Sequence, residues 1–132
     1  MNNYSEYYQA LIKPNFAPPE WVFGLAWGII YPLMAIAFVY IAYLIHKGVL
    51  SKKVMWVYLI NIIFNILFTP IQFGLQNNVL SMVDILIVVG TLFSLQIILF
   101  KKSKLSFILL LPYLLWGTFA TILQVTITYL NF

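Results

Sequence analysis

Few residues in this chain could do chemistry, and most of those are aromatic rings and side-chain amides. The sequence has no cysteine and a single histidine, His46, which stands in a basic stretch. Thiolate chemistry is therefore excluded, and no histidine is near enough to the apolar segments to pair with a serine or a carboxylate. Metal ligation is unsupported for the same reason, and no glycine-rich phosphate loop is present. The sequence thus contains no acid–base or nucleophile constellation.

Three amides and one aromatic ring follow one another at helical spacing. Asn61, Asn65, Phe68 and Gln72 are separated by four, three and four residues, which places them on one face of a helix. Amides on one face should point into a helical bundle and away from lipid. Two interpretations stay open at this stage, hydrogen bonding between helices and a ligand-facing wall.

Aromatic residues form two further stripes at helical spacing. The stripes consist of Phe23, Trp27, Tyr31 and Met34 in one segment, and of Tyr113, Trp116, Ala120 and Leu123, with Gln124 beside them, in another. Such stripes more often serve helix packing than ligand binding. Trp21 and Trp56 stand instead at the ends of apolar segments, where tryptophan is typical of an interfacial anchor.

One acidic residue, Asp84, stands inside an apolar segment. It lies roughly 9 Å into the expected helix, at about 1.5 Å per residue. Ionisable groups in such positions are costly and usually functional. Asp84 is expected either to form a structural hydrogen bond or to contact a ligand directly, and a single carboxylate is weak support for proton-coupled transport.

The elements that must position these residues are membrane-spanning helices. The chain has 132 residues, of which 64% are hydrophobic and 8% charged, whereas soluble domains carry about 25% charged residues. Four apolar stretches are long enough to span a bilayer, at about residues 21–45, 54–73, 79–100 and 105–130. They must be helical because an open strand edge cannot be satisfied in lipid. The sequence predicts an all-α integral membrane bundle of four transmembrane helices, a single domain over residues 1–132 with residues 1–20 as an outer loop region.

Prolines mark the expected helix ends and bends. Pro18 and Pro19 stand where a helix start tolerates them, and Glu20 in the first turn is favoured by the helix dipole. Three more prolines, Pro32, Pro70 and Pro112, fall inside expected helices. Each removes one backbone hydrogen bond, so each should kink its helix.

The lysines predict the orientation in the membrane. The chain has seven basic residues, all lysine, and six of them fall in the first and third inter-helix loops. These loops contain His46, Lys47, Lys52 and Lys53, and Lys101, Lys102 and Lys104. The positive-inside rule makes both loops cytoplasmic and puts both termini outside, in a bacterial-type cytoplasmic membrane. Lysines confined to short loops do not form a nucleic-acid patch.

The stretch YYQALIKPNFAPPEWVFGLAWGIIYPLM resembles the signature of the TspO/MBR family, the tryptophan-rich sensory proteins and translocator proteins. The family pattern reads roughly W-Y-x-x-L-x-K-P-x-W-x-P-P-x-W-V-F-x-x-x-W-x-x-L-Y-x-x-M-G. The match continues with Asn65, with MVDILIV around Asp84 and with PYLLWGTFATIL from Pro112. It covers nearly the whole chain in order and spacing. The departures are Phe16 and Phe68 at tryptophan positions, Ala35 at a glycine position and Gln124 where many members have asparagine.

The resemblance implies a site. The family usually has five transmembrane helices, and here the helix before the K-P-x-x-x-P-P loop is missing, which fits either a short four-helix branch or a truncated chain. The family's pocket lies under that loop, here residues 11–19 with Lys13, Pro14, Pro18 and Pro19. By resemblance, the pocket wall consists of Trp27, Tyr31, Asn65, Phe68, Trp116 and Ala120.

The resemblance also implies a function, a membrane receptor or sensor that binds tetrapyrroles such as porphyrins. No covalently bound cofactor is expected, and the porphyrin would be a ligand or a substrate. Some bacterial members are said to degrade porphyrin under light, and Trp27 and Trp116 match the implicated positions. Such a reaction needs an oxidisable ring and not a nucleophile, so the lack of an acid–base pair does not count against it. The alternatives are a small transporter of porphyrin-like or other hydrophobic ligands and a structural membrane subunit.

Two partner expectations complete this interpretation. The family's sterol motif needs a basic residue after a tyrosine near the end of the last helix, but Tyr129 is followed only by Leu-Asn-Phe, so specific sterol binding is not expected. A homodimer is expected, because the family forms dimers and because the amide face of the second helix would need a second subunit wherever the other helices leave it uncovered.

Overall fold

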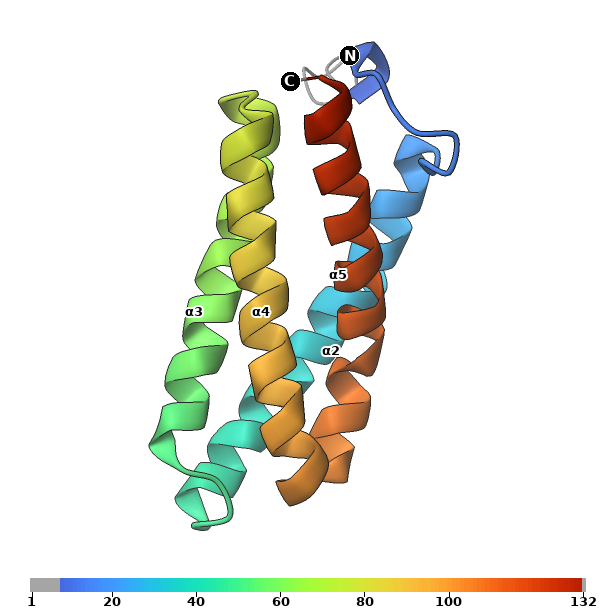
Figure 1. Cartoon of the computed structure of the whole chain (residues 1–132). Helices are drawn as coiled ribbons and strands as arrows, with labels where there is room; N and C mark the ends of the chain where they lie inside the picture. Colours follow the sequence, from blue (N-terminus) through green and yellow to red (C-terminus); the bar gives the residue numbers. More distant parts are fainter. Residues whose placement is uncertain (1–7, 132) are drawn as a thin grey trace.

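The computed structural model describes residues 8–131 and is all-α over that range (Figure 1). Its long elements are α2 (Glu20–His46), α3 (Lys52–Thr69) with its π-helical continuation η1 (Pro70–Gly74), α4 (Asn78–Lys102) and α5 (Lys104–Leu130). Each of the four spans, with α3 and η1 counted together, is long and apolar enough to cross a membrane. The predicted all-α membrane bundle is confirmed, and each span begins and ends within two residues of its predicted limits.

Short polar signals explain where the helices begin. Pro19 occupies the N-cap position of α2 with a φ of −58°, and Glu20 follows in the first turn, as predicted. The Asn77 side chain accepts a hydrogen bond from the Leu80 backbone N–H at 2.9 Å and caps α4. Ser103 alone separates α4 from α5, and its hydroxyl accepts from the Ser106 N–H at 3.3 Å. The Asn77 and Ser103 side chains thus satisfy donors that the first turns of α4 and α5 leave without a partner.

The three internal prolines have different outcomes. Pro32 and Pro112 lie inside continuous α-helices, α2 and α5. Pro70 has no N–H to donate to the carbonyl four residues back. The helix continues from Pro70 as one wide π-helical turn, in which the Leu75 N–H donates to the Pro70 carbonyl at 2.9 Å. The span therefore continues through Pro70 without an interruption, and it keeps Gln72 buried.

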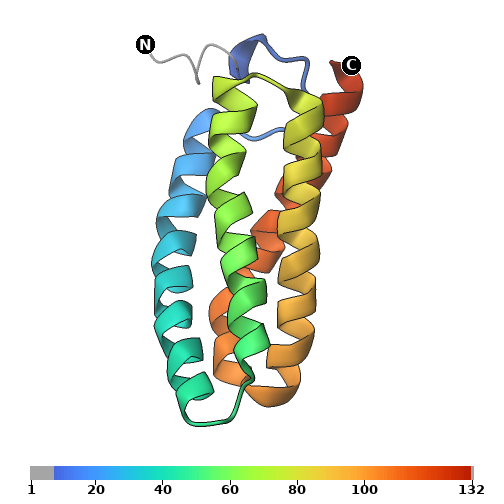
Figure 2. The same cartoon turned by 90° about the vertical axis from the view of Figure 1, so that its left-hand side faces the viewer.

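The helices do not pack equally against one another. α4 packs along both α5 and α3, and α2 packs mainly against α5 and touches α3 only lightly. Seen from the α3 side, α5 lies behind α3 and α4 (Figure 2). The tightest part of the core is formed by fully buried side chains in the half of the bundle nearer the lysine loops: Ile41, Tyr58, Leu92, Leu95, Leu99 and Leu110. The other half, where α2 and α3 stand apart, has room for a cavity.

The outer surface has the pattern of a lipid-facing bundle. Large apolar side chains such as Ile29, Ile63 and Leu115 are more than half exposed, at 55%, 54% and 66%. Trp21 and Trp56 are 68% and 67% exposed, one near each end of the bundle, as expected of interfacial anchors. The chain is therefore an integral membrane protein.

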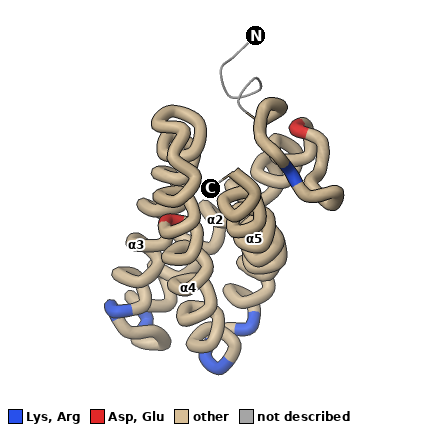
Figure 3. The backbone as a smooth tube through the Cα atoms, turned by 45° about the horizontal axis from the view of Figure 1, so that its top comes forward, with Lys and Arg blue, Asp and Glu red and all other residues tan. Residues whose placement is uncertain are grey.

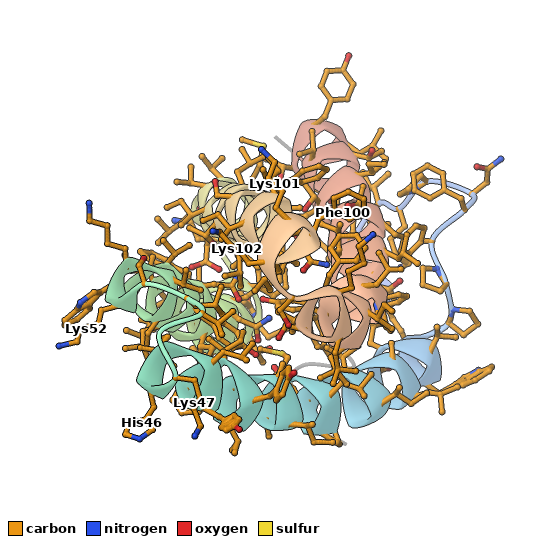
Figure 4. The ribbon with its side chains drawn as sticks, turned by 90° about the horizontal axis from the view of Figure 1, so that it is seen from below. His46, Lys47, Lys52, Phe100, Lys101 and Lys102 are labelled. Atoms are coloured by element: carbon orange, nitrogen blue, oxygen red, sulfur yellow. The ribbon has the colours of Figure 1, made fainter. Side chains whose placement is uncertain are left out.

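The lysines of the two inter-helix loops gather at one end of this bundle (Figure 3). Seen from that end, His46, Lys47 and Lys52 lie around the loop between α2 and α3, and Lys101 and Lys102 lie at the end of α4 (Figure 4). Both ends of the described chain lie at the opposite end (Figure 1). This is the arrangement that the lysine pattern requires, and the cytoplasmic position of the lysine end stays a prediction.

Candidate functional site

A cavity of about 740 Å³ lies between α2 and α3 in the half of the bundle that holds the chain ends. The first part of α2, the end of α3 with η1, and the second half of α5 form most of its wall. Its aromatic lining residues are Tyr8, Trp21, Phe23, Trp27, Tyr31, Phe68, Phe73 and Trp116. Its polar or charged lining residues are Glu20, Asn65, Thr69, Gln72 and Gln124, and the remainder are Gly24, Ile85, Ala120, Leu123 and Ile127. The light contact between α2 and α3 is what leaves this space.

The structure brings all six residues of the expected pocket wall together. Trp27 and Tyr31 come from α2, Asn65 and Phe68 from α3, and Trp116 and Ala120 from α5, and all six line the cavity. The aromatic stripes of α2 and α5 therefore belong to the cavity as well as to the helix packing.

Contacts between rings fix the aromatic wall. Trp27 stacks on Tyr31, with ring centroids 5.2 Å apart and planes at 26°, and Tyr113 meets Trp27 edge-on at 6.3 Å. On the α5 side, Trp116 meets Phe23 edge-on at 5.7 Å. Stacked and edge-to-face pairs are the favourable arrangements of aromatic rings. The wall is thus held in place before any ligand arrives.

A chain of hydrogen bonds joins the helices at the deep end of the cavity. The Tyr31 hydroxyl of α2 donates to Asn65 Oδ1 of α3 at 3.0 Å, and Asn65 Nδ2 donates to the Tyr113 hydroxyl of α5 at 2.9 Å. Tyr113 donates in turn to Asn61 Oδ1 at 2.7 Å, and Asn61 Nδ2 donates to the Val88 carbonyl of α4 at 2.8 Å. Every long helix contributes at least one member to this network, and α3 contributes two.

A second polar cluster lies on the η1 side of the cavity. Gln124 Nε2 donates to Gln72 Oε1 at 3.2 Å, and Gln72 Nε2 donates to Asn78 Oδ1 at 3.0 Å. The Thr128 hydroxyl donates to the Asn78 backbone carbonyl at 3.0 Å. The interpretation of the amide face as hydrogen bonding between helices is confirmed, and a ligand-facing role stays a prediction. Asn61 serves hydrogen bonding between helices alone, and Asn65 and Gln72 do so while also lining the cavity.

The loop of residues 11–19 borders the cavity but does not line it. Lys13 Nζ donates to the Tyr8 and Leu11 carbonyls at 2.7 and 3.2 Å and lies 4.8 Å above the Tyr8 ring. Asn131, just after α5, exchanges two hydrogen bonds with the Ile12 backbone at 2.9 and 3.1 Å. The loop is thus fastened along the end of α5.

Prolines shape the same loop. The Ala17 N–H donates to the Pro14 carbonyl at 3.1 Å in a turn, and the Tyr8 hydroxyl donates to the Pro18 carbonyl at 2.8 Å. Pro19 then begins α2. Lys13, Pro14, Pro18 and Pro19 therefore position the residues on either side of the loop, Tyr8 and Glu20, which do line the cavity.

Glu20 and Tyr8 are electrostatically coupled where the loop meets the cavity. Burial raises the pKa of the Tyr8 phenol, and the negative charge of Glu20 raises this pKa further. Glu20 itself is exposed. The Lys13 ammonium lies 4.8 Å above the same Tyr8 ring, so charges of both signs stand near the entrance of the cavity.

Asp84 meets neither of its expected roles. It is 3% exposed, and both carboxylate oxygens are buried without a hydrogen-bond partner among the described residues. It does not line the cavity, although its neighbour Ile85 does. Within residues 8–131 there is also no group of His, Cys, Asp and Glu side chains that could hold a metal ion.

Several lining residues were not predicted as site residues. Gly24 and Glu20 lie three and seven positions before Trp27, so the helical spacing of the aromatic stripe could have identified them. Phe73 follows Phe68 by five positions, the spacing of the π-helical turn, which an α-helical pattern does not anticipate. Trp21, expected only as an anchor, also lines the cavity.

The fold and the cavity together define a membrane helical bundle with an aromatic-lined cavity. The chain matches the TspO/MBR family over residues 1–130, and it belongs to that family.

Named relatives span bacteria and animals. The chain is 38% identical to the tryptophan-rich protein TspO of Bacillus cereus over 128 residues, which is 95% of this chain and 80% of that protein. It is 32% identical to the tryptophan-rich sensory protein of Cereibacter sphaeroides over 116 residues, covering 88% of this chain and 71% of that protein. It is 34% identical to the translocator protein of Homo sapiens over 123 residues, covering 89% and 70%.

Proposed function

We propose that this protein binds a tetrapyrrole, a porphyrin or a close analogue, in the cavity between α2 and α3. One observation carries the proposal: a space of about 740 Å³ is lined by eight aromatic residues and a few amides. Small-molecule pockets are usually of about 300–1,000 Å³, mostly apolar, with a small number of polar groups. The names of the relatives support a sensor or translocator role for such binding.

The chemistry of the wall suits a flat macrocycle. A porphyrin is a large π-system, and its faces stack favourably on aromatic rings. The stacked pair of Trp27 and Tyr31 offers such a surface on α2, and Trp116 and Phe68 offer others on α5 and α3. Asn65 and Gln72 each use most of their hydrogen-bonding capacity within their own cluster, so the wall would be mainly apolar to a ligand.

The direct test is a titration of the full chain in lipid nanodiscs with a porphyrin, followed by absorbance of the Soret band. We expect a saturable shift at micromolar porphyrin, absent from empty nanodiscs. Absorbance that rises linearly with porphyrin, as in empty nanodiscs, would refute the proposal.

Degradation of the porphyrin under light is a second candidate function. The observation that favours it is that Trp27 and Trp116 line the same cavity from two neighbouring helices, α2 and α5. A ligand in this space would lie near two oxidisable indoles. Transport is less well supported, because α2–α5 contain one buried acid, Asp84, and no lysine or arginine away from their ends.

A further inference from the structure

The end of the bundle that is remote from the cavity carries all but one of the lysines of the described chain (Figure 3). We call this surface the basic end. Its lysines lie in the two inter-helix loops or on the helix turns beside them, and all are exposed: Lys47, Lys52, Lys53, Lys101, Lys102 and Lys104. Each of the four spans therefore has at least one lysine at this end or directly beside it.

No acidic side chain in the described residues lies near enough to balance this charge. Within residues 8–131 the acidic residues are Glu20 and Asp84. Glu20 precedes Lys47 by 27 positions along α2, and Asp84 precedes Lys102 by 18 positions in α4. At about 1.5 Å per residue these separations are about 40 Å and about 27 Å, whereas salt screens charges beyond about 8 Å at physiological ionic strength.

The helices themselves gain little from several of these charges. Lys52 and Lys53 are the first two residues of α3, and Lys104 is the first residue of α5. Neither helix has an acidic residue in its first turn. A positive charge is unfavourable at the N-terminus of a helix, where the helix dipole is itself positive. A negatively charged partner outside the bundle would offset this cost.

Aromatic side chains place the basic end at the depth of the lipid headgroups. Trp56 and Tyr43 are 67% and 49% exposed, and tryptophan and tyrosine are enriched at the membrane–water interface. Lys52 lies one helical turn farther out than Trp56, and Lys47 one turn farther out than Tyr43. The Lys47 ammonium also lies 5.6 Å from the centroid of the Tyr43 ring. We therefore expect the ammonium groups to stand at the height of the lipid phosphates.

We propose that the basic end is a binding surface for anionic phospholipids, which it enriches around the protein over zwitterionic ones. An anionic lipid brings a net negative charge to the lysines, whereas the positive group of a zwitterionic headgroup offsets its own phosphate. The lysines are spread over the ends of all four spans, at headgroup depth, which fits a ring of lipid better than one docked acidic protein. This surface is separate from the cavity and does not depend on what the cavity binds.

The experiment measures lipid selectivity by electron paramagnetic resonance. The full chain is reconstituted in phosphatidylcholine vesicles that contain a trace of spin-labelled phosphatidylcholine or spin-labelled phosphatidylglycerol, with the label near the end of an acyl chain. The fraction of motionally restricted label gives the association of each lipid with the protein. We expect phosphatidylglycerol to associate at least about twofold more strongly than phosphatidylcholine, and we expect added salt to reduce this preference.

Variants assign the preference to the basic end. The fourfold variant Lys52→Gln, Lys53→Gln, Lys101→Gln and Lys102→Gln removes four of the six charges from exposed positions, so it should fold normally and lose most of the preference. The matched control replaces the same four lysines by arginine, keeps the charge and should keep the preference. Circular dichroism of both variants, expected to match the wild type, checks the fold, and the salt dependence of the wild type gives a test that needs no variant.

Three results would overturn the proposal. The first is equal association of the two lipids with the wild type. The second is a preference that survives either high salt or the four glutamine substitutions. The third concerns free phosphate: inorganic phosphate and chloride at equal ionic strength should weaken the preference equally, and a stronger effect of phosphate would show that the lysines bind the free ion and not the lipid. Porphyrin titration is unaffected by any of these results, so the proposed function is tested separately.

Discussion

Ala120 is the smallest of the six residues that form the expected pocket wall, and it faces the cavity from the middle of α5. Ala120→Leu adds bulk to a space bordered by Trp116 and Leu123. We expect porphyrin affinity to fall roughly tenfold, because overfilling a defined space costs about 1–3 kcal/mol. Soret titration measures the change. Ala42→Leu, at an exposed position of α2 outside the cavity, is the matched control and should bind normally.

The two indoles of the cavity give a separate prediction about light. If the protein promotes porphyrin loss, illuminated porphyrin should disappear faster with protein than with empty nanodiscs. The variant with both Trp27→Phe and Trp116→Phe should lose this acceleration and still bind, because phenylalanine keeps a stacking face but is much harder to oxidise. Absorbance decay under constant illumination measures the rate. Equal decay with the double variant would leave a binding protein only.

Asp84 gives a prediction about stability. A buried carboxyl group without a hydrogen-bond partner among the described residues is a cost to the fold. Asp84→Val removes that cost with little change in volume, so the free energy of unfolding should rise by about 1–3 kcal/mol. Thermal unfolding in detergent should therefore occur at a higher temperature. Asn61→Val, which breaks bonds to Val88, Thr91 and Tyr113, should do the opposite. A less stable Asp84→Val protein would mean that the carboxyl group has a partner or a function that compensates for its burial.

At the scale of the elements, the turn at Pro70 sets the position of the residues that follow it. Pro70→Ala restores the missing N–H, so the end of α3 can continue as an ordinary α-helix in place of η1. The residues after position 70 should then rotate about the helix axis by about one residue. That rotation would move Gln72 away from Gln124 and Asn78. We expect porphyrin affinity to fall several-fold although the helix itself is less strained.

The control for this variant is Pro32→Ala, because Pro32 lies in a continuous α-helix and outside the cavity. Its affinity should remain near that of the wild type. Hydrogen exchange over residues 66–75 would report the change at η1 directly. Unaltered exchange and unaltered affinity in Pro70→Ala would show that the wide turn does not depend on the proline.

The helices themselves were predictable because each is a long apolar run between charged or turn-forming residues. Helical spacing alone predicted which residues share a face, such as Trp27 with Tyr31 and Asn61 with Asn65. The wide turn at η1 did not, because a proline in a helix can produce a kink, a break or a π turn. Nor could the sequence show that α2 stands apart from α3, since that depends on how all four helices pack. The cavity, and Phe73 and Glu20 as parts of its wall, follow from that packing.

At the scale of the whole molecule, the structure changes the argument for a dimer. Asn61, Asn65 and Gln72 are 0%, 6% and 2% exposed within one chain, so this amide face needs no second subunit to cover it. The homodimer expected from the family resemblance stays a prediction, but an exposed amide face no longer supports it. Cross-linking in native membranes and single-molecule subunit counting in bilayers should show pairs. A dominant monomer across a wide range of protein-to-lipid ratios would contradict it.

The light contact between α2 and α3 also has a consequence for the route by which the proposed ligand would enter. Tyr31 lies on the cavity wall about 17 Å along α2 from Glu20, well inside the span, yet its side chain is 45% exposed. Because α2 and α3 touch only lightly, we expect this wall to be open to hydrocarbon as well as to the aqueous entrance, so that the proposed porphyrin ligand could reach it from the bilayer by lateral diffusion. The membrane is then the reservoir, and the mole fraction of ligand in lipid governs occupancy. A dissociation constant expressed per volume of water should rise in proportion to the amount of lipid present, whereas one expressed per lipid should stay constant.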